Sequence, residues 1–74
     1  MRYEPDRCRL KEHYKVTGIN QRMVHIITAI PESQLSDYAN NRTIMGYSPA
    51  VTIAKALRLD NNEDLYTWRI VEEP

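Results

Sequence analysis

The sequence predicts an all-α fold of five short helices in one domain, residues 1–74. Apolar residues recur at helical spacing in short stretches, for example Leu35 and Tyr38, as in helices that bury one face. Residues that favour helix ends, among them Gly18 and Pro31, separate these stretches. A chain of 74 residues has room for one core, close to the lower size at which a core is stable without disulfides or metals.

The first helix is expected from about residue 7 to residue 16. Asp6 can cap its start, Leu10 and Tyr14 face the interior, and Gly18 lies just beyond its end.

The second and third helices are expected on either side of a tight break at residues 29–31. Asn20 favours the N-cap of the second helix, whose buried face carries Val24 and Ile27. Pro31 has no amide N–H and disfavours the helical conformation at the residue before it, so one helix must end and another can begin there. Two helices held at a steep angle by a tight turn form a helix-turn-helix, whose second helix can enter the major groove of DNA.

A loop rich in turn formers is expected from residue 40 to residue 47. Ser48 and Pro49 then form the pattern of a helix start, an N-cap followed by proline at the first helical position. This fourth helix is expected to end near Arg58.

Asp60 can cap a final short helix that ends near Tyr66. Residues 66–70 alternate between apolar and polar types, so this segment could instead continue as a short strand. The expected core consists of the apolar residues on the inner helix faces: Leu10, Val24, Ile27, Leu35, Tyr38, Ile53, Leu57 and Leu65.

Composition and motifs argue against several classes of protein. Cys8 is the single cysteine, which excludes an internal disulfide framework and suits a reducing cytoplasm. No apolar run approaches the length of a membrane span, and the charged N-terminus is unlike a signal peptide. His13 and His25 have no carboxylate or cysteine at metal-ligand spacing. We expect a cytoplasmic protein with no metal, no cofactor and no enzymatic activity.

The motifs, taken in order, resemble the Cro/CI-type (XRE) helix-turn-helix of phage repressors. Residues 18–21, Gly-Ile-Asn-Gln, match the family's opening of helix two, Gly-Leu-Thr/Asn-Gln. Residues 52–59 and 63–66 match its closing Ile-Ala-Lys-Ala-Leu and Asp-Glu-Leu-Phe motifs. The resemblance runs from about Cys8 to Tyr66 and implies a five-helix fold like that of the lambda repressor DNA-binding domain.

The resemblance also implies a sequence-specific transcriptional regulator of phage or prophage type, which acts by occupying an operator in double-stranded DNA. In the family, the glutamine that matches Gln21 holds the DNA backbone, and the exposed face of the third helix reads bases. Serines on that face can bond to several bases, and a carboxylate can accept from a cytosine amino group. The expected DNA-contacting residues are Gln21, Arg22, Glu32, Ser33, Ser36, Asp37, Asn40, Arg42 and Thr43.

A homodimer is expected because one domain of this kind covers only a half-site. The densest apolar cluster at a chain end consists of Tyr66, Trp68, Ile70 and Val71, and it is the expected dimer interface. The alternative is that Trp68 folds back as a lid on the core.

Charge favours a second class of function. Ten basic residues cancel ten acidic ones, whereas affinity for DNA comes largely from the neutralisation of phosphates. Glu32 in the first turn of a helix offsets the helix dipole, but Asp37 has no such explanation. The alternative is therefore a protein-interaction module on the same fold, an antirepressor or a partner of a larger repressor, with weak or no DNA binding.

Overall fold

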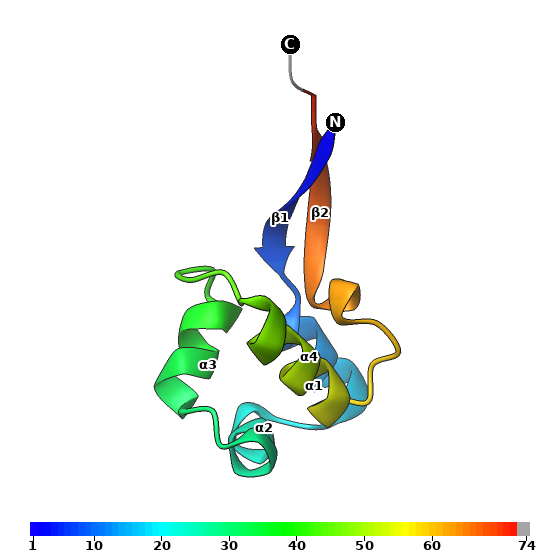
Figure 1. The fold of residues 1–74 in the computed structure, drawn as a ribbon. Helices are drawn as coiled ribbons and strands as arrows, with labels where there is room; N and C mark the ends of the chain where they lie inside the picture. The colour runs from blue at the N-terminus through cyan, green and yellow to red at the C-terminus, as the bar shows by residue number, and fades with distance from the viewer. Residues whose placement is uncertain (73–74) are drawn as a thin grey trace.

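The computed structural model describes residues 1–72 and shows a small mixed α/β domain. Four α-helices form a body from which two antiparallel strands project as a ribbon, with the N-terminus and the end of the second strand towards its tip (Figure 1). The elements are β1 (Arg2–Cys8), α1 (Leu10–Thr17), α2 (Gln21–Thr28), α3 (Glu32–Ala39), α4 (Tyr47–Ala56), a 3-10 turn η1 (Asn62–Leu65) and β2 (Tyr66–Val71).

The prediction of an all-α, five-helix fold is wrong at both ends of the chain. The expected fifth helix is only the short η1, and residues 66–71 form a strand, the alternative that their alternation allowed. The first helix begins at Leu10 instead of residue 7, and Asp6 lies in β1 instead of capping the helix. The partner that turns residues 2–8 into a strand lies some 60 positions along the chain, where no local pattern reveals it.

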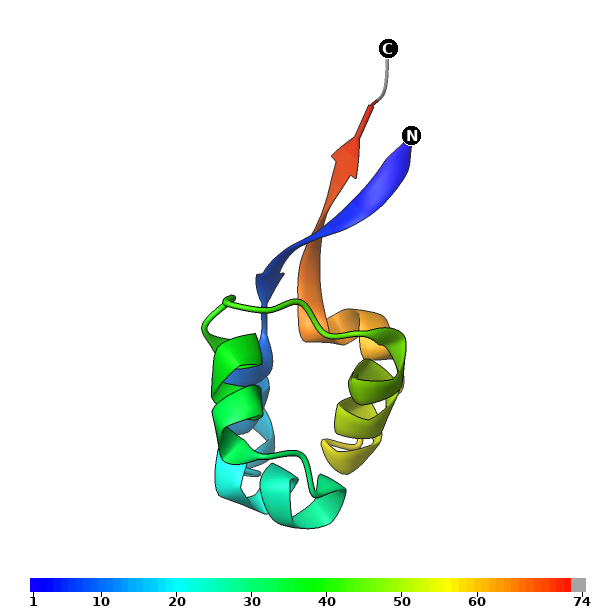
Figure 2. The same ribbon diagram turned by 60° about the vertical axis from the view of Figure 1, so that its left-hand side comes forward.

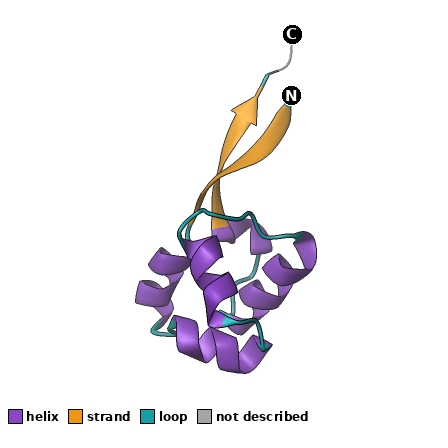
Figure 3. Ribbon diagram, turned by 90° about the vertical axis from the view of Figure 1, so that its left-hand side faces the viewer, coloured by secondary structure: helices purple, strands orange, loops and turns teal. Residues whose placement is uncertain are grey.

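The ribbon has one apolar face and one charged face. Cross-strand pairing sets Tyr3 opposite Ile70 and Pro5 opposite Trp68, so these four side chains share a face. The other face carries Glu4, whose carboxylate lies 3.0 Å from Arg2 and 3.3 Å from Arg69. In Figure 3 the outer half of the ribbon stands clear of the helices.

The core lies between the helices and the base of the ribbon. Its fully buried side chains include Leu10, Val24, Leu35, Ile53, Leu57 and Leu65, and Tyr38 is also buried. These core predictions are confirmed, but the one for Ile27 is wrong, because its side chain is 60% exposed. None of the helices in residues 1–72 has the length and apolar character needed to cross a membrane.

The loop after α3 ties the base of the ribbon to the helical body. Asn41 has a left-handed φ of 61°, which asparagine tolerates better than most residues. Its side-chain Oδ1 accepts a 2.7 Å hydrogen bond from the backbone N–H of Cys8, the last residue of β1. Figure 2 shows this loop crossing the base of the ribbon on its way to α4. That helix begins at Tyr47, two residues before Pro49, with Gly46 rather than Ser48 as its N-cap.

Candidate nucleic-acid interface

The helices α2 and α3 are joined by a short turn that is fixed by side-chain hydrogen bonds. Asn20 caps α2 through Oδ1, which accepts the N–H of Met23 at 2.9 Å. At the other end of α2, a ring nitrogen of His25 lies 2.7 Å from the carbonyl oxygen of Ile30. The hydroxyl of Thr28 accepts the N–H of Ile30 at 3.1 Å. These bonds orient α3 relative to α2.

The turn also contains a strained residue. Ala29 ends α2 with a φ of 62°, a left-handed conformation in which a side chain costs about 1–3 kcal/mol. Pro31 follows as the N-cap of α3 with an extended ψ of 143°. The break predicted at residues 29–31 is therefore confirmed.

At the start of the two helices, the expected phosphate-binding residues contact α3. The amide of Gln21 donates to the backbone carbonyl of Glu32 at 3.4 Å, which is a long and weak hydrogen bond. A guanidinium nitrogen of Arg22 lies 3.7 Å from the Glu32 carboxylate. Arg22 is exposed, so this ion pair is solvated.

At the other end of α3, the expected site residues form one network. Asp37 accepts a 2.9 Å bond from Arg42 Nε, and another guanidinium nitrogen of Arg42 lies 3.5 Å from the hydroxyl of Ser36. The amide of Asn40 donates to the carbonyl of Ser36 at 2.9 Å, and its oxygen accepts from Lys11 Nζ at 2.7 Å. The structure thus brings four of the predicted residues together and adds Lys11, which sequence reasoning missed.

Ser33 and Thr43 are the predicted residues outside these contacts. Both are exposed, and neither side chain has a hydrogen-bond partner within residues 1–72. Ser33 therefore presents a free hydroxyl on the outer face of α3.

The acidic residues on α3 are neutralised within the molecule. Glu32 pairs with Arg22 and Asp37 pairs with Arg42, so the face of α3 is close to neutral rather than acidic. Exposed ion pairs contribute only about 0–1 kcal/mol each. Either arginine can therefore exchange its carboxylate for another anion at small cost.

Two buried side chains that can titrate, His13 and Cys8, lie outside the set of expected DNA-contacting residues. His13 is buried, and its Nε2 lies 2.6 Å from the carbonyl oxygen of Asp64. Burial raises the pKa of the Cys8 thiol, which makes it a poorer nucleophile at neutral pH. Across residues 1–72 no three His, Cys, Asp or Glu side chains are grouped so that they could hold a metal ion.

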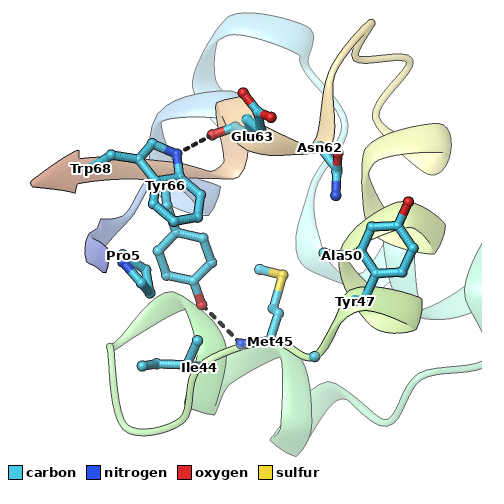
Figure 4. Close-up of a pocket in the computed structure, with 10 residues that line it drawn as sticks. Pro5, Ile44, Met45, Tyr47, Ala50, Asn62, Glu63, Tyr66 and Trp68 are labelled. Carbon is cyan, nitrogen blue, oxygen red and sulfur yellow. Dashed lines mark hydrogen bonds between the residues drawn. The ribbon is translucent and has the colours of Figure 1, made fainter. Parts of the chain in front are cut away.

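The residues expected at the dimer interface are divided between the core and both faces of the ribbon. Tyr66 is buried, and its hydroxyl accepts the N–H of Met45 at 3.1 Å (Figure 4). Trp68 is 44% exposed, and its indole N–H donates to the carbonyl of Glu63 at 2.9 Å. Ile70 is 55% exposed on the same apolar face. Val71 lies on the charged face, because it pairs with Arg2.

Trp68 also borders a groove at the base of the ribbon. The groove has a volume of about 470 Å³ and is lined by Met45, Ala50 and Tyr66, among others (Figure 4). The rings of Tyr66 and Trp68 lie 6.2 Å apart at 60°, so Trp68 partly covers the core and partly faces solvent.

Comparisons of the chain with protein-family models, with curated proteins and with solved structures find no match.

Proposed function

We propose that this chain is a sequence-specific DNA-binding transcriptional regulator of the Cro/CI type that acts by occupying an operator. The observation that carries the proposal is the α2–turn–α3 unit, in which hydrogen bonds fix an exposed α3 beside α2. An α-helix fits the major groove, and its outward side chains then meet base edges. The outer face of α3 offers the hydroxyls of Ser33 and Ser36 for such contacts.

Contacts to the DNA backbone come from the edges of this unit. Gln21 begins α2, where free backbone N–H groups favour a phosphate. Arg22 and Arg42 exchange their carboxylate partners for phosphates, which arginine can bind through two parallel hydrogen bonds. The carboxylates released in this way, Glu32 and Asp37, can accept from a cytosine amino group.

The proposed working unit is a homodimer that joins two half-sites. A symmetric pair in which the apolar faces of two ribbons pack together buries Tyr3, Trp68 and Ile70, which are each at least 44% exposed in the single chain. The support for this contact is that helices leave the outer half of the ribbon uncovered in all three views (Figures 1–3).

The test is a salt-titrated mobility-shift assay with DNA from the chain's own genomic neighbourhood. Affinity is expected to fall steeply as salt rises from about 50 to 200 mM, because phosphate contacts release counterions. Arg42→Ala is expected to weaken binding to all sequences alike and to reduce the salt slope by about one unit. Lys15→Ala, which removes an exposed charge on α1 outside the set of residues proposed to contact DNA, is the control. Absence of binding at about 50 mM salt would contradict the proposal.

A second candidate is a protein-interaction module on the same fold, an antirepressor or a partner of a larger repressor. The pairing of both arginines with acidic residues on α3 favours it, as does the zero net charge. This candidate predicts a specific protein complex whose formation changes little with salt, together with no shift of DNA in the same assay.

A further inference from the structure

Three large apolar side chains of α2 are exposed to solvent. Met23 is 43% exposed, Ile26 is 68% exposed and Ile27 is 60% exposed. Exposed helix faces normally carry polar residues, and clustered exposed apolar side chains mark sites of interaction. These side chains lie outside the set proposed to contact DNA, so DNA binding does not explain them.

Two of the three side chains line a groove. Met23 and Ile27 form one wall, Ile19 and Leu57 contribute further apolar surface, and the groove has a volume of about 530 Å³. Its other wall is the end of α4 at Ala56 together with Arg58, two residues beyond that end. Ile26 lies outside the lining, although it is on the same helix. No residue of the α3 face and none of the ribbon lines this groove, so it is a separate surface.

One exposed cation without a partner lines the groove. It is Arg58, whose side chain has no ion-pair or hydrogen-bond partner within residues 1–72. This differs from Arg22 and Arg42, whose charges are balanced by carboxylates on α3. None of the acidic residues within 1–72 lines the groove, so a complementary occupant carries negative charge opposite Arg58.

Arg58 also occupies a costly backbone position. Its φ is 58°, the left-handed conformation that glycine adopts after a helix end with less conformational strain than other residues. The chain thus places a cation beside the apolar wall where an uncharged glycine would fit with less strain.

We propose that this groove binds an amphipathic helix of another protein, with apolar residues at i, i+3 or i+4 spacing and acidic residues on its flanks. The apolar wall accepts the buried stripe of such a helix, and the unpaired guanidinium of Arg58 accepts a carboxylate on its flank. The lining comes from α2, the ends of α1 and α4 and the residues that follow those ends, with no strand edge within the described residues. A helix-in-groove mode therefore fits and strand addition does not. The proposal does not depend on DNA binding, because none of the described α3 residues lines this groove.

The test is a display library of helical peptides of about 14 residues, roughly four turns. Leucine is fixed at i, i+3, i+4 and i+7, and the remaining positions vary among Asp, Glu, Lys, Arg, Ser and Ala. The full chain is the target, and binding of the selected peptides is measured by fluorescence anisotropy. Selected peptides are expected to be enriched in acidic residues, and a version of each with lysine in place of glutamate is expected to bind at least about tenfold more weakly.

Matched variants locate the binding site. Ile27→Gln is expected to weaken binding of the acidic peptides at least about tenfold, whereas Ile26→Gln, on the same helix but outside the groove, leaves it within about twofold. Both side chains are exposed, so neither change disturbs the core. No enrichment, enrichment without acidic bias, or equal sensitivity to the two variants would overturn the proposal. Self-association of the free chain that is lost in Ile27→Gln would overturn it too, because a second copy would then be the occupant.

Discussion

At the scale of single residues, Tyr14 is a source of instability inside the body. Its hydroxyl is buried and has no hydrogen-bond partner within residues 1–72, and a buried polar group without a partner costs about 1–3 kcal/mol. Tyr14→Phe removes that hydroxyl and keeps the ring. The free energy of unfolding in urea is expected to rise by about 1 kcal/mol.

The same residue predicts a dependence on pH. Burial, with a smaller contribution from Cys8, raises the pKa of Tyr14 from 10.0 to about 12. A pKa that is higher in the folded state than in the unfolded chain stabilises the fold fully below pH 10, and this contribution is lost as the pH rises through about 12. Unfolding free energy should therefore fall across this interval less steeply in Tyr14→Phe than in the original chain. Equal slopes in both proteins would show that Tyr14 ionises freely.

Leu35 and Ile27 form a pair that tests the boundary of the core. Leu35 is fully buried on α3, so Leu35→Ala is expected to cost about 2–5 kcal/mol of unfolding free energy. Ile27 is 60% exposed on α2, so Ile27→Ala is expected to lower the unfolding free energy by much less, about 0.5 kcal/mol. Denaturant midpoints of the two variants check this order, and a reversal would mean that α2 is rotated about its axis.

Asp37 distinguishes base reading from repulsion. Asp37→Asn removes the carboxylate that accepts a 2.9 Å hydrogen bond from Arg42. It also removes a negative charge from the surface that is proposed to face DNA phosphates. If Asp37 only competes for Arg42, affinity rises for every DNA sequence alike. If it reads a cytosine, base preference changes as well. Asp60→Asn, the same charge change at an exposed residue away from α3, is the control. A competition assay against randomised DNA measures both quantities, and no difference from Asp60→Asn would remove Asp37 from the interface.

At the scale of elements, the ribbon is the part on which the proposed homodimer depends. An isolated two-stranded ribbon is marginally stable in water, and here Tyr3 and Ile70 on its apolar face are exposed. Ile70→Thr keeps the strand propensity but makes that face more polar, and it is expected to shift the proposed dimer towards monomer in sedimentation measurements. Val71→Thr, on the opposite face, is expected to leave the association unchanged. A full chain that stays monomeric at high concentration and on its operator would end the dimer proposal.

The helices α2 and α3 could be predicted from the sequence, β2 appeared only as an alternative and β1 could not be predicted, for reasons of distance along the chain. Capping by Asn20 and the break at Pro31 act over a few residues, so a local pattern reveals α2 and α3. The pairing of Cys8 with Tyr66 depends on a segment at the other end of the chain. The site divides in the same way. Arg42 and Asp37 are close in sequence, so their contact follows from the local pattern. Lys11 contacts Asn40, which lies 29 positions away in the sequence, and no sequence motif predicts this contact.

At the scale of the whole molecule, the shape separates three surfaces. The described chain is elongated, 45 Å by 23 Å by 20 Å, because the ribbon extends beyond the helices (Figure 1). None of the described residues of α3 or of the ribbon lines the groove beside α2. The proposed DNA contacts, the proposed dimer contact and the proposed helix-binding groove therefore use different residues.

The hydrogen bond between Asn41 and Cys8 affects which spacing between half-sites the proposed dimer would bind. It fixes the base of the ribbon to the residues that follow α3, two positions beyond the end of that helix. Two chains joined through their ribbons would then hold their α3 helices at one separation and one relative rotation. An extra base pair between half-sites turns one of them by about 34° around the DNA axis, since B-DNA has about 10.5 base pairs per turn. A ribbon held in one orientation relative to α3 would not follow that rotation. The spacing between half-sites, as well as their sequence, would then select the operator.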